Sequence, residues 1–521
     1  MSEFREDEKH PGVWAVRTPS KPAFIHQITG EAITYAEVES LSNQVAHLAR
    51  SFGLQRGDHA AVFLENRIDY APIFWGFMRA GLKVTPIPTH LTPEEVDYIL
   101  TDSGARLLVT SQAKRQVAEQ LRGPKLLPGA RFMLDDAGGG YASFEAALAK
   151  FPTHPIADQS EGSEMLYSSG TTGKPKGVVR PMSEAPFGTP TKGMTLTCDR
   201  WGITDQTVWF HPAPMYHAAP IGYALRVMRW GGTMIVSGKF DPEQALATIE
   251  KHRVTHSQWV PTHFVRMLRL PEEVKAKYDL SSLRCAIHAA APCPPQVKKA
   301  MIEWWGPVIE EYYAGSEANG VVTISSQEWL RKPGSVGTPI LGRTRICDDD
   351  GNEVPAGTEG TIHFSDGPSF EYHNDPQKTA DSRNAQGWTT LGDVGYVDAD
   401  GYLFLTDRKT FMIVSGGVNI YPAEIENLLA THPRVGDVAV IGVPDEEFGE
   451  SVKAVIELPE GVAPSPELAQ EIIEFCRAHL SHVKCPRTVD FIDRLPRADN
   501  GKLYKRQLRD EYWKGRDRRI A

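Results

Sequence analysis

The most informative segment of the chain is Tyr167-Ser-Ser-Gly-Thr-Thr-Gly-Lys-Pro-Lys-Gly177. Its glycines allow the backbone to turn N–H groups toward an anion, and its hydroxyl groups and lysines add further donors and positive charge. Binding a triphosphate requires these properties. The stretch is not a Walker loop, because only two residues separate Gly170 from Gly173. The flanks Met165-Leu-Tyr and Val178-Val-Arg predict that the loop joins two strands of a hairpin, although a polar turn of no function would have a similar composition.

Short apolar runs alternate with helical periodicity on both sides of this loop. Strands are expected at residues 60–64, 83–87 and 107–110 before the loop, and near 207–211, 233–237, 285–289 and 308–312 after it. Helices are expected at residues 71–81 and after Thr92, which is followed by proline and two acids. This alternation is typical of βαβ units, so we expect an α/β fold with doubly wound, largely parallel sheets.

The alternation of predicted strands and helices changes toward the C-terminus. Residues 334–407 hold short strands and Asp-Gly turns, which predict a small antiparallel, β-barrel-like subdomain or sheet. Beyond them we expect a helix at 423–431, strands near 438–443 and 452–457, and a helix at 466–480. We therefore divide the chain into an N-terminal domain, residues 1–409, and a small mobile α+β domain, residues 410–521.

Composition excludes several classes of protein. The chain has 521 residues and a net charge of −10, which argues against a nucleic-acid partner. Its first ten residues are highly charged, and no apolar run reaches the roughly 18 to 20 residues of a membrane span. The richest apolar run, residues 70–84, is interrupted by Arg79. The six cysteines lack the spacing of zinc or iron–sulfur sites. We expect a cytoplasmic protein without an integral membrane segment.

The segment Ser168–Gly177 resembles the phosphate-binding loop of the adenylate-forming (AMP-binding) superfamily, which includes acyl-CoA synthetases, firefly-type luciferases and the adenylation domains of peptide synthetases. Other segments resemble motifs of the same superfamily in the same order: Glu311-Tyr-Tyr-Ala-Gly-Ser-Glu317, Trp388-Thr-Thr-Leu-Gly-Asp393, Ser415-Gly-Gly-Val-Asn-Ile-Tyr-Pro-Ala-Glu-Ile-Glu426 and Pro496-Arg-Ala-Asp-Asn-Gly-Lys502. The resemblance covers nearly the whole chain. It implies an acyl-CoA synthetase of the fatty-acid–CoA ligase type, an AMP-forming acid–thiol ligase that uses ATP, Mg²⁺ and coenzyme A.

The resemblance also implies a nucleotide site. Tyr313 would stack on adenine, Glu311 would accept from its exocyclic amine, Asp393 would accept from the ribose hydroxyls, and Thr171 and Glu317 would hold Mg²⁺. The full set implied for ATP and AMP is Ser168, Ser169, Gly170, Thr171, Thr172, Gly173, Lys174, Lys176, Ala290, Ala291, Glu311, Tyr312, Tyr313, Ala314, Ser316, Asp393 and Arg408. This sequence departs from the family pattern at Ala314, usually glycine, and at Ser316, usually threonine.

A site for the acid is implied beside the nucleotide. Its expected lining is Tyr216, His217, Trp259, Val260, Ala289, Ala314 and Gly315, with His217 as the gate near the carboxylate. Residues 214–220 lack the aspartate that would pair with a substrate ammonium, and burying an unpaired ammonium is costly. We therefore expect an apolar acid, whether fatty, aromatic, alicyclic or steroid-like, and not an α-amino acid.

Three residues are implied to be catalytic, namely Lys502, His217 and Glu317, and Thr410 matches the hinge position. Coenzyme A would meet Ser415, Gly416, Gly417, Phe448, Lys484 and Arg487. The expected reaction has two steps, adenylation of the acid and transfer of the acyl group to coenzyme A. A carrier-protein thiol or oxygen as the acceptor, a non-catalytic nucleotide-binding regulator and a homodimer remain open alternatives.

Overall fold

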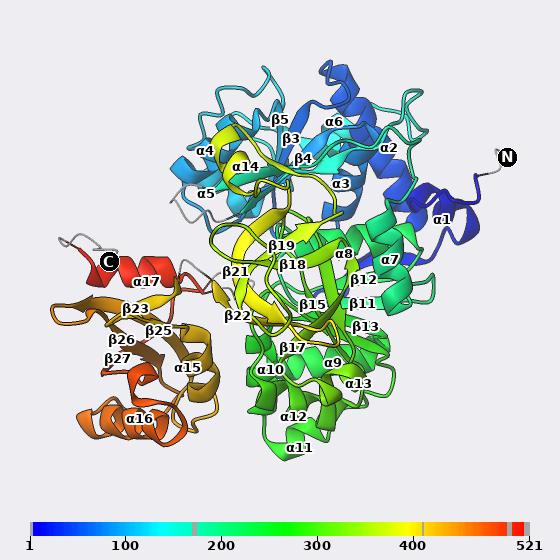
Figure 1. Ribbon diagram of the computed structural model, residues 1–521. Coiled ribbons are helices and arrows are strands. Elements are labelled where there is room, and N and C mark those ends of the chain that lie inside the picture. Colours follow the sequence, from blue (N-terminus) through cyan, green and yellow to red (C-terminus); the bar gives the residue numbers. More distant parts are fainter. Residues whose placement is uncertain (1–3, 169–174, 409–410, 498–502, 515–521) are drawn as a thin grey trace.

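The computed structural model describes residues 4–168, 175–408, 411–497 and 503–514. Two large sheets, a three-stranded sheet and their helices form the larger part of the molecule, and residues 411–497 and 503–514 form a smaller part beside it (Figure 1). The expected α/β class and the arrangement of a large part followed by a small one are confirmed. The boundary at residue 409 stays a prediction, since Lys409 and Thr410 lie outside the described residues.

The first sheet is parallel and comes from the chain before the phosphate loop. Its strands in spatial order are β7 (Ala142–Ser143), β6 (Arg131–Leu134), β5 (Leu107–Ser111), β3 (His59–Phe63), β4 (Lys83–Pro86) and β8 (Ser163–Glu164). The three strands predicted in this region are β3, β4 and β5. Each is a short run of apolar and β-branched residues, which suits a strand buried on both faces.

The second sheet is larger and mixed. Its spatial order is β18 (Arg343–Cys347), β19 (Gly360–Ser365), β21 (Thr389–Val397), β22 (Leu403–Arg408), β17 (Ser335–Leu341), β16 (Val321–Ile324), β15 (Ile309–Tyr313), β14 (Cys285–His288), β13 (His256–Trp259), β11 (Val208–His211), β12 (Thr233–Val236), β1 (Pro22–His26) and β2 (Ala32–Thr34). The strands from β1 to β15 in this order run parallel, and those from β15 to β18 pair antiparallel.

The expectation of a barrel-like subdomain at residues 334–407 was wrong, whereas the antiparallel sheet named with it is present. The turns at Asp350-Gly351 and Asp400-Gly401 form as expected, with both glycines at positive φ. However, β17 pairs with β16 as well as with β22, so these strands extend the large sheet as an open antiparallel end. Local turn signals specify hairpins but not whether the outer strands meet.

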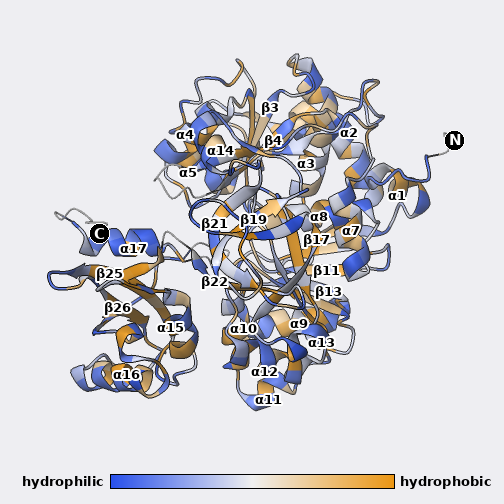
Figure 2. Cartoon of the chain, viewed as in Figure 1, coloured by the Kyte–Doolittle hydropathy of each residue, from blue (hydrophilic) through white to orange (hydrophobic). Residues whose placement is uncertain are grey.

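The helices cover both sheets. They are α1 (Pro11–Arg17), α2 (Tyr35–Ser51), α3 (Tyr70–Arg79), α4 (Pro93–Ser103), α5 (Arg115–Ala118), α6 (Phe144–Leu148), α7 (Lys192–Trp201), α8 (Ala218–Arg229), α9 (Pro242–His252), α10 (Pro261–Leu268), α11 (Glu272–Lys275), α12 (Pro295–Trp305), α13 (Ser326–Arg331) and α14 (Pro376–Asp381). The largest core lies between the two sheets, where Val45 of α2, Ile73 of α3 and Leu225 of α8 pack together. Hydrophobic residues follow the strands and the inner helix faces in Figure 2.

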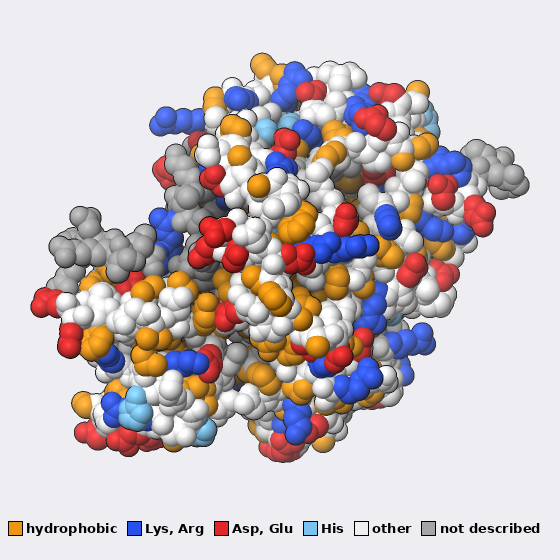
Figure 3. Space-filling model, in the orientation of Figure 1, with side chains coloured by type: hydrophobic (Ala, Val, Ile, Leu, Met, Phe, Trp, Pro, Cys, Tyr) orange, Lys and Arg blue, Asp and Glu red, His pale blue; other side chains and the backbone are white. Residues whose placement is uncertain are grey.

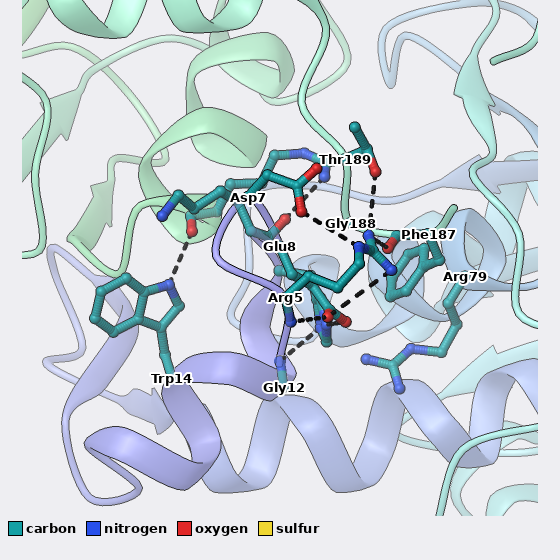
Figure 4. Close-up of polar contacts among 12 residues, drawn as sticks. Arg5, Asp7, Glu8, Gly12, Trp14, Arg79, Phe187, Gly188 and Thr189 are labelled. Atoms are coloured by element: carbon teal, nitrogen blue, oxygen red, sulfur yellow. Dashed lines mark hydrogen bonds and ion pairs between the residues drawn. The ribbon is translucent and has the colours of Figure 1, made fainter. Parts of the chain in front are cut away.

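Hydrogen bonds attach the N-terminal segment to the part of the molecule that holds this core (Figure 4). Arg5 donates to the carbonyl of Phe187 at 3.2 Å and to the Thr189 hydroxyl at 3.1 Å. Trp14 on α1 donates its indole N–H to the carbonyl of Arg229, the last residue of α8, at 2.8 Å. The bond from Trp14 holds α1 against the C-terminal end of α8, and the bonds from Arg5 hold the preceding segment to the loop before α7.

Arg79 explains how α3 can be buried although it contains a charge. The Arg79 side chain is fully buried, and its guanidinium forms an ion pair with Glu39 of α2 and donates to Asn43. A buried charge is tolerated when it is paired and hydrogen-bonded. In the part of the chain that the structure describes, no helix is long and apolar enough to cross a membrane.

The smaller part has its own sheet and core. Its strands are β24 (Val418–Ile420), β23 (Ile413–Ser415), β26 (Gly449–Glu457), β25 (Asp437–Asp445) and β27 (Thr488–Ile492), and its helices are α15 (Pro422–Leu429), α16 (Pro466–His479) and α17 (Lys505–Tyr512). The two helices and two strands predicted here are α15, α16, β25 and β26. On the face drawn in Figure 3, the described Lys and Arg side chains are interspersed with Asp and Glu and form no extended basic stripe.

Candidate active site

The phosphate loop is held by a hairpin, as its flanks predicted. Strands β9 (Leu166–Ser168) and β10 (Lys176–Val179) pair antiparallel, with Gly177 opposite Tyr167. A third strand, β20 (Glu371–Tyr372), pairs with β10 on its other side. Lys176 forms an ion pair with Asp375 at 2.8 Å, and this hydrogen bond raises the pKa of the lysine. The loop residues Ser169, Gly170, Thr171, Thr172, Gly173 and Lys174 and the side chain of Ser168 lie outside the described residues.

Glu317 lies next to this hairpin. Its carboxylate is buried, and Oε1 accepts a hydrogen bond from the phenol of Tyr372, on β20, at 2.9 Å. Tyr372 thus connects Glu317 to the hairpin of the phosphate loop, a contact that the sequence did not suggest. No group of three His, Cys, Asp or Glu side chains in the described ranges could hold a metal by itself. A lone carboxylate suits Mg²⁺ when substrate phosphates supply most of its ligands.

Tyr313 and Asp393 meet across the large sheet. Tyr313, the last residue of β15, donates its phenol proton to Asp393 Oδ2 at 2.7 Å, and its ring stacks against Phe364 at a centroid distance of 6.1 Å. Asp393 is buried and lies opposite Arg408 in the pairing of β21 with β22. The side chain of Arg408 lies outside the described residues. The aromatic residue expected to stack on adenine and the carboxylate expected to bind the ribose are therefore in direct contact.

Two segments of small residues follow neighbouring parallel strands. Residues 289–291 come directly after β14, and residues 314–316 come directly after β15, which pairs with β14. Ligands of open α/β sheets bind at the carboxyl ends of such strands. Ala290 is exposed and has a φ of +74°, whereas Ala289 is buried. A Cβ atom at Gly315 would lie 2.2 Å from a methyl group of Leu391, so the leucine side chain would have to shift to admit it.

Glu311 lies in a buried ion pair. Its Oε2 accepts from the ammonium of Lys298, on α12, at 2.5 Å, and the ring of His288 lies 3.4 Å away. Burial raises the pKa of Glu311, and the charge of Lys298 opposes that effect. The expected contact with an adenine amine would therefore use Oε1. Neither Lys298 nor His288 was singled out from the sequence, because a lysine on a helix is usually exposed.

The expected acid site begins where β11 ends. His217 is the N-cap residue of α8, and its ring lies 4.6 Å from the ring of buried Tyr216. Val260 is the N-cap residue of α10. Trp259 packs in the core against Phe264 and Trp305 of α10 and α12, so its place in an acid pocket stays a prediction.

Tyr312 faces away from the expected nucleotide residues. Side chains alternate along a strand, so Tyr312 projects from the opposite face of β15 to Glu311. Its ring lies among Trp201 of α7 and Tyr223 of α8, and its phenol oxygen accepts from Gln258 at 3.0 Å. The sequence grouped Tyr312 with the nucleotide residues, whereas the structure places it on the side of α8. Gln258 was not predicted.

The expected coenzyme A residues divide into two groups. The hairpin of β23 and β24 carries Gly416, whose N–H donates to the carbonyl of Phe448 at 2.9 Å. Gly417 has a φ of +80°, and Ser415 is buried at the end of β23. The guanidinium of Arg487 lies 3.9 Å from the centroid of the Phe448 ring. Lys484 instead pairs with Glu424 of α15 at 2.6 Å. Lys502 and Thr410 lie outside the described residues.

The smaller part contacts the larger one through α10 and β22. Arg269, the C-cap residue of α10, donates to the carbonyls of Val435 and Gly436 at 2.8 Å each. The backbone N–H of Ala423 donates to Asp407 at 2.9 Å. Figure 1 shows α15 on the side of the smaller part that faces these elements.

Comparisons with known proteins agree with this geometry. The profile of the AMP-binding enzyme family matches residues 13–370, and that of the AMP-binding enzyme C-terminal domain matches residues 424–502. The long-chain-fatty-acid–CoA ligase FadD13 of Mycobacterium tuberculosis is 30% identical over 502 residues, covering 96% of this chain and 97% of its own. The fatty acid–[acyl-carrier-protein] ligase ScoC of Streptomyces coeruleorubidus is 31% identical over 521 residues, covering 97% and 96%.

A solved structure shares the fold. The anthranilate CoA ligase AuaEII in complex with anthranoyl-AMP superimposes with a TM-score of 0.83 at 27% identity, covering 98% of each chain. The chain therefore belongs to the AMP-binding, adenylate-forming enzyme family and is a ligase of the acyl-CoA synthetase type. Enzymes of this family use ATP and coenzyme A with a carboxylic acid.

Proposed function

We propose that this enzyme activates an apolar carboxylic acid with Mg-ATP and transfers the acyl group to the thiol of coenzyme A. The observation that carries the nucleotide part is the contact between Tyr313 and Asp393, close to the segments that follow β14 and β15. An aromatic face for adenine and a carboxylate that can accept from two ribose hydroxyls lie together there.

The first step forms one bond and breaks one. A carboxylate oxygen of the acid bonds to the α-phosphorus, and the bond from that phosphorus to the pyrophosphate oxygen breaks. Lys502 would donate to the carboxylate and the α-phosphate while charge moves onto the pyrophosphate, which is a preorganised electrostatic contribution. Asp393 and Tyr313 would hold the nucleoside, and residues 168–176 would hold the phosphates.

Magnesium would be held by Glu317 and Thr171 together with phosphate oxygens. Bound there, it supplies charge neutralisation for the phosphates. Glu317 suits this role because it is a buried carboxylate whose orientation is fixed by Tyr372.

The second step replaces oxygen by sulfur at the acyl carbon. The thiol sulfur of coenzyme A bonds to this carbon, the bond to the AMP oxygen breaks, and the thiol proton is released. Ser415, Gly416 and Gly417 would line the path of the thiol once the smaller part has rotated. Phe448 and Arg487, already stacked, would meet the nucleotide end of coenzyme A.

A carrier-protein thiol is a second candidate for the acceptor of the acyl group. ScoC is named as a ligase of an acyl carrier protein, and it is as similar to this chain as FadD13 is. A carrier-protein thiol would undergo the same second step. Coenzyme A is favoured because Phe448 and Arg487 offer an aromatic face and a guanidinium, groups that suit an adenine and a phosphate.

The experiment is a product assay with a panel of fatty, aromatic and alicyclic acids. AMP and pyrophosphate are expected in equal amounts, and thioester is expected only when coenzyme A is added. ADP and phosphate as the stoichiometric products would contradict the proposal. Thioester formation on carrier protein but not on coenzyme A would favour the second candidate.

A further inference from the structure

Three polar side chains lie together on the α8 side of the large sheet. His211 ends β11, Gln258 lies in β13 and Tyr312 in β15, all of which belong to the parallel part of the sheet. Trp209, two residues before His211, stacks on Tyr223 of α8 at 4.7 Å, which identifies this face. These side chains lie toward the carboxyl ends of their strands, where open α/β sheets bind ligands.

A backbone N–H group fixes which atoms in this group donate hydrogen bonds and which accept them. The N–H of Ala213 donates to Nδ1 of His211 at 3.2 Å. Burial lowers the pKa of His211 to about 3, so the ring is neutral and its proton is on Nε2. His211 Nε2 is turned toward the Gln258 amide without reaching ordinary hydrogen-bond geometry, and neither it nor Gln258 Oε1 has another partner in the described ranges.

The orientation of the Gln258 amide in turn makes the phenol oxygen of Tyr312 an acceptor. Because the oxygen of the Gln258 amide faces the N–H of His211, its nitrogen donates to the phenol oxygen of Tyr312 at 3.0 Å. A phenol that accepts in this way still has one proton to donate. Among the residues described, no acceptor takes up that proton. An apolar tail bound here would exclude water from the phenol and leave this donor unpaired at a cost in free energy, whereas an acceptor on the ligand would avoid that cost.

The place is accessible to a ligand. Tyr312 is only half-buried, and so are Ala218 and Ala219, whose small side chains open α8 directly after His217. Burial raises the pKa of Tyr312 to about 12, which keeps the phenol protonated at neutral pH.

The ligand group that would accept a hydrogen bond from Tyr312 should be uncharged. Arg226 on α8 donates to the Thr197 hydroxyl at 3.2 Å and to the carbonyl of Gly222 at 2.8 Å, and its charge also acts on the half-buried carboxylate of Glu164 and on the phenol of Tyr312. This guanidinium is thus already engaged. A second carboxylate on the ligand would have to compete with these acceptors for the guanidinium of Arg226 and would be costly to bury.

We propose that Tyr312 recognises an oxygen on the tail of the acid, so that the preferred substrates are apolar acids carrying a keto, hydroxyl or ether oxygen remote from the carboxylate. This inference rests on the proposed function, since it places the acid on the α8 side of β15 beside His217. It narrows the expected substrates from acids with any apolar tail to acids whose tail carries one hydrogen-bond acceptor.

The test compares matched acids in an AMP-release assay with the full-length enzyme. Chain and ring acids with an oxygen at successive positions are each paired with the acid in which CH₂ replaces that oxygen. For at least one pair the oxygen-bearing acid is expected to have a kcat/KM about tenfold higher or more, since a buried donor is otherwise left unpaired. Tyr312→Phe should reduce this preference to about one and leave kcat/KM for the all-carbon acid within about twofold.

Tyr278→Phe is the matched control, because Tyr278 donates to Glu243 at 2.8 Å on the other side of the sheet. This variant should keep the preference of the wild-type enzyme. The absence of a preference for the oxygen-bearing acid in every pair, or a preference for oxygen that survives in Tyr312→Phe, would overturn the inference. Release of AMP with only all-carbon acids would leave the proposed function standing. Absence of AMP release with every acid would instead overturn the proposed function and this inference with it.

Discussion

Tyr313 and Asp393 are 80 positions apart in the chain, yet the phenol of one donates to the carboxylate of the other at 2.7 Å. The tyrosine ends β15 in the middle of the large sheet, and the aspartate lies in β21 near its antiparallel end. The bond fixes the orientation of a carboxylate that we propose binds the ribose. It also holds the tyrosine ring in place for the adenine.

This relationship predicts how two variants differ. Asp393→Asn keeps the size of the side chain but removes the charge and one acceptor, so the KM for ATP should rise about tenfold or more. Tyr313→Phe keeps the carboxylate and the aromatic ring, so its KM for ATP should rise less, by about two- to fivefold. Initial rates at saturating acid and coenzyme A measure both values. An equal KM in Asp393→Asn and the wild-type enzyme would remove Asp393 from the ribose site.

The buried pair of Lys298 and Glu311 predicts a large change in stability. Lys298→Met removes the cation and leaves a buried carboxylate, which typically costs about 3–5 kcal/mol in the free energy of unfolding. Lys298→Met combined with Glu311→Gln should recover part of this loss, because no unpaired charge remains. Urea unfolding monitored by tryptophan fluorescence checks both variants.

The same pair predicts a pH dependence. Burial raises the pKa of Glu311 in the folded state and Lys298 opposes this, so the pKa should rise further in Lys298→Met. A raised folded-state pKa means that the folded state holds the proton more tightly, so stability falls as pH rises above the unfolded value of about 4.3. The free energy of unfolding of Lys298→Met, relative to wild type, should therefore decrease from about pH 5 to pH 8. The double variant should show no such slope, and a slope that it shares would point to another group.

Lys502 should act in the first step only. Lys502→Ala should slow adenylation by about 10²- to 10³-fold, which is typical for loss of a preorganised contact to developing charge. It should convert a chemically prepared acyl-adenylate and coenzyme A to thioester at a near-normal rate. Gly417→Val should show the opposite pattern by obstructing the thiol, although its φ of +80° makes a check of folding essential. Equal damage to both half-reactions by Lys502→Ala would contradict rotation of the smaller part.

Phe448 should matter for coenzyme A and not for ATP. Its ring is stacked on Arg487 at 3.9 Å, and replacing such a surface by alanine typically costs about 1–3 kcal/mol of base stacking. Phe448→Ala should raise the KM for coenzyme A about fivefold or more and leave the KM for ATP unchanged. Phe475→Ala, which removes a half-buried ring from α16, is the control. A rise of both KM values in Phe448→Ala would indicate a general defect of the smaller part.

Local signals in the sequence predicted the α/β class, three of the six strands of the first sheet, four parallel strands of the second, the hairpin around the phosphate loop and the family. Periodicity, turn residues and motifs are local signals, and they are preserved wherever the segment lies in the fold. The strand β13 was missed because its residues, His256-Ser-Gln-Trp259, include three polar ones and lack the apolar run of a buried strand. That strand carries Gln258.

Which side chains contact one another depends on how separate elements pack, and the sequence did not predict it. The antiparallel end of the large sheet stays open because β17 pairs with β16, a contact that no turn residue specifies. Lys298 became the partner of Glu311, Tyr372 that of Glu317, and Gln258 that of Tyr312, because packing of separate elements brought them within hydrogen-bond distance. Motifs specify which groups a site contains. The role of Tyr312 as acceptor from Gln258 depends on Ala213, His211 and Gln258, three residues of two other strands and a loop, and such long-range contacts leave no periodic trace in the sequence.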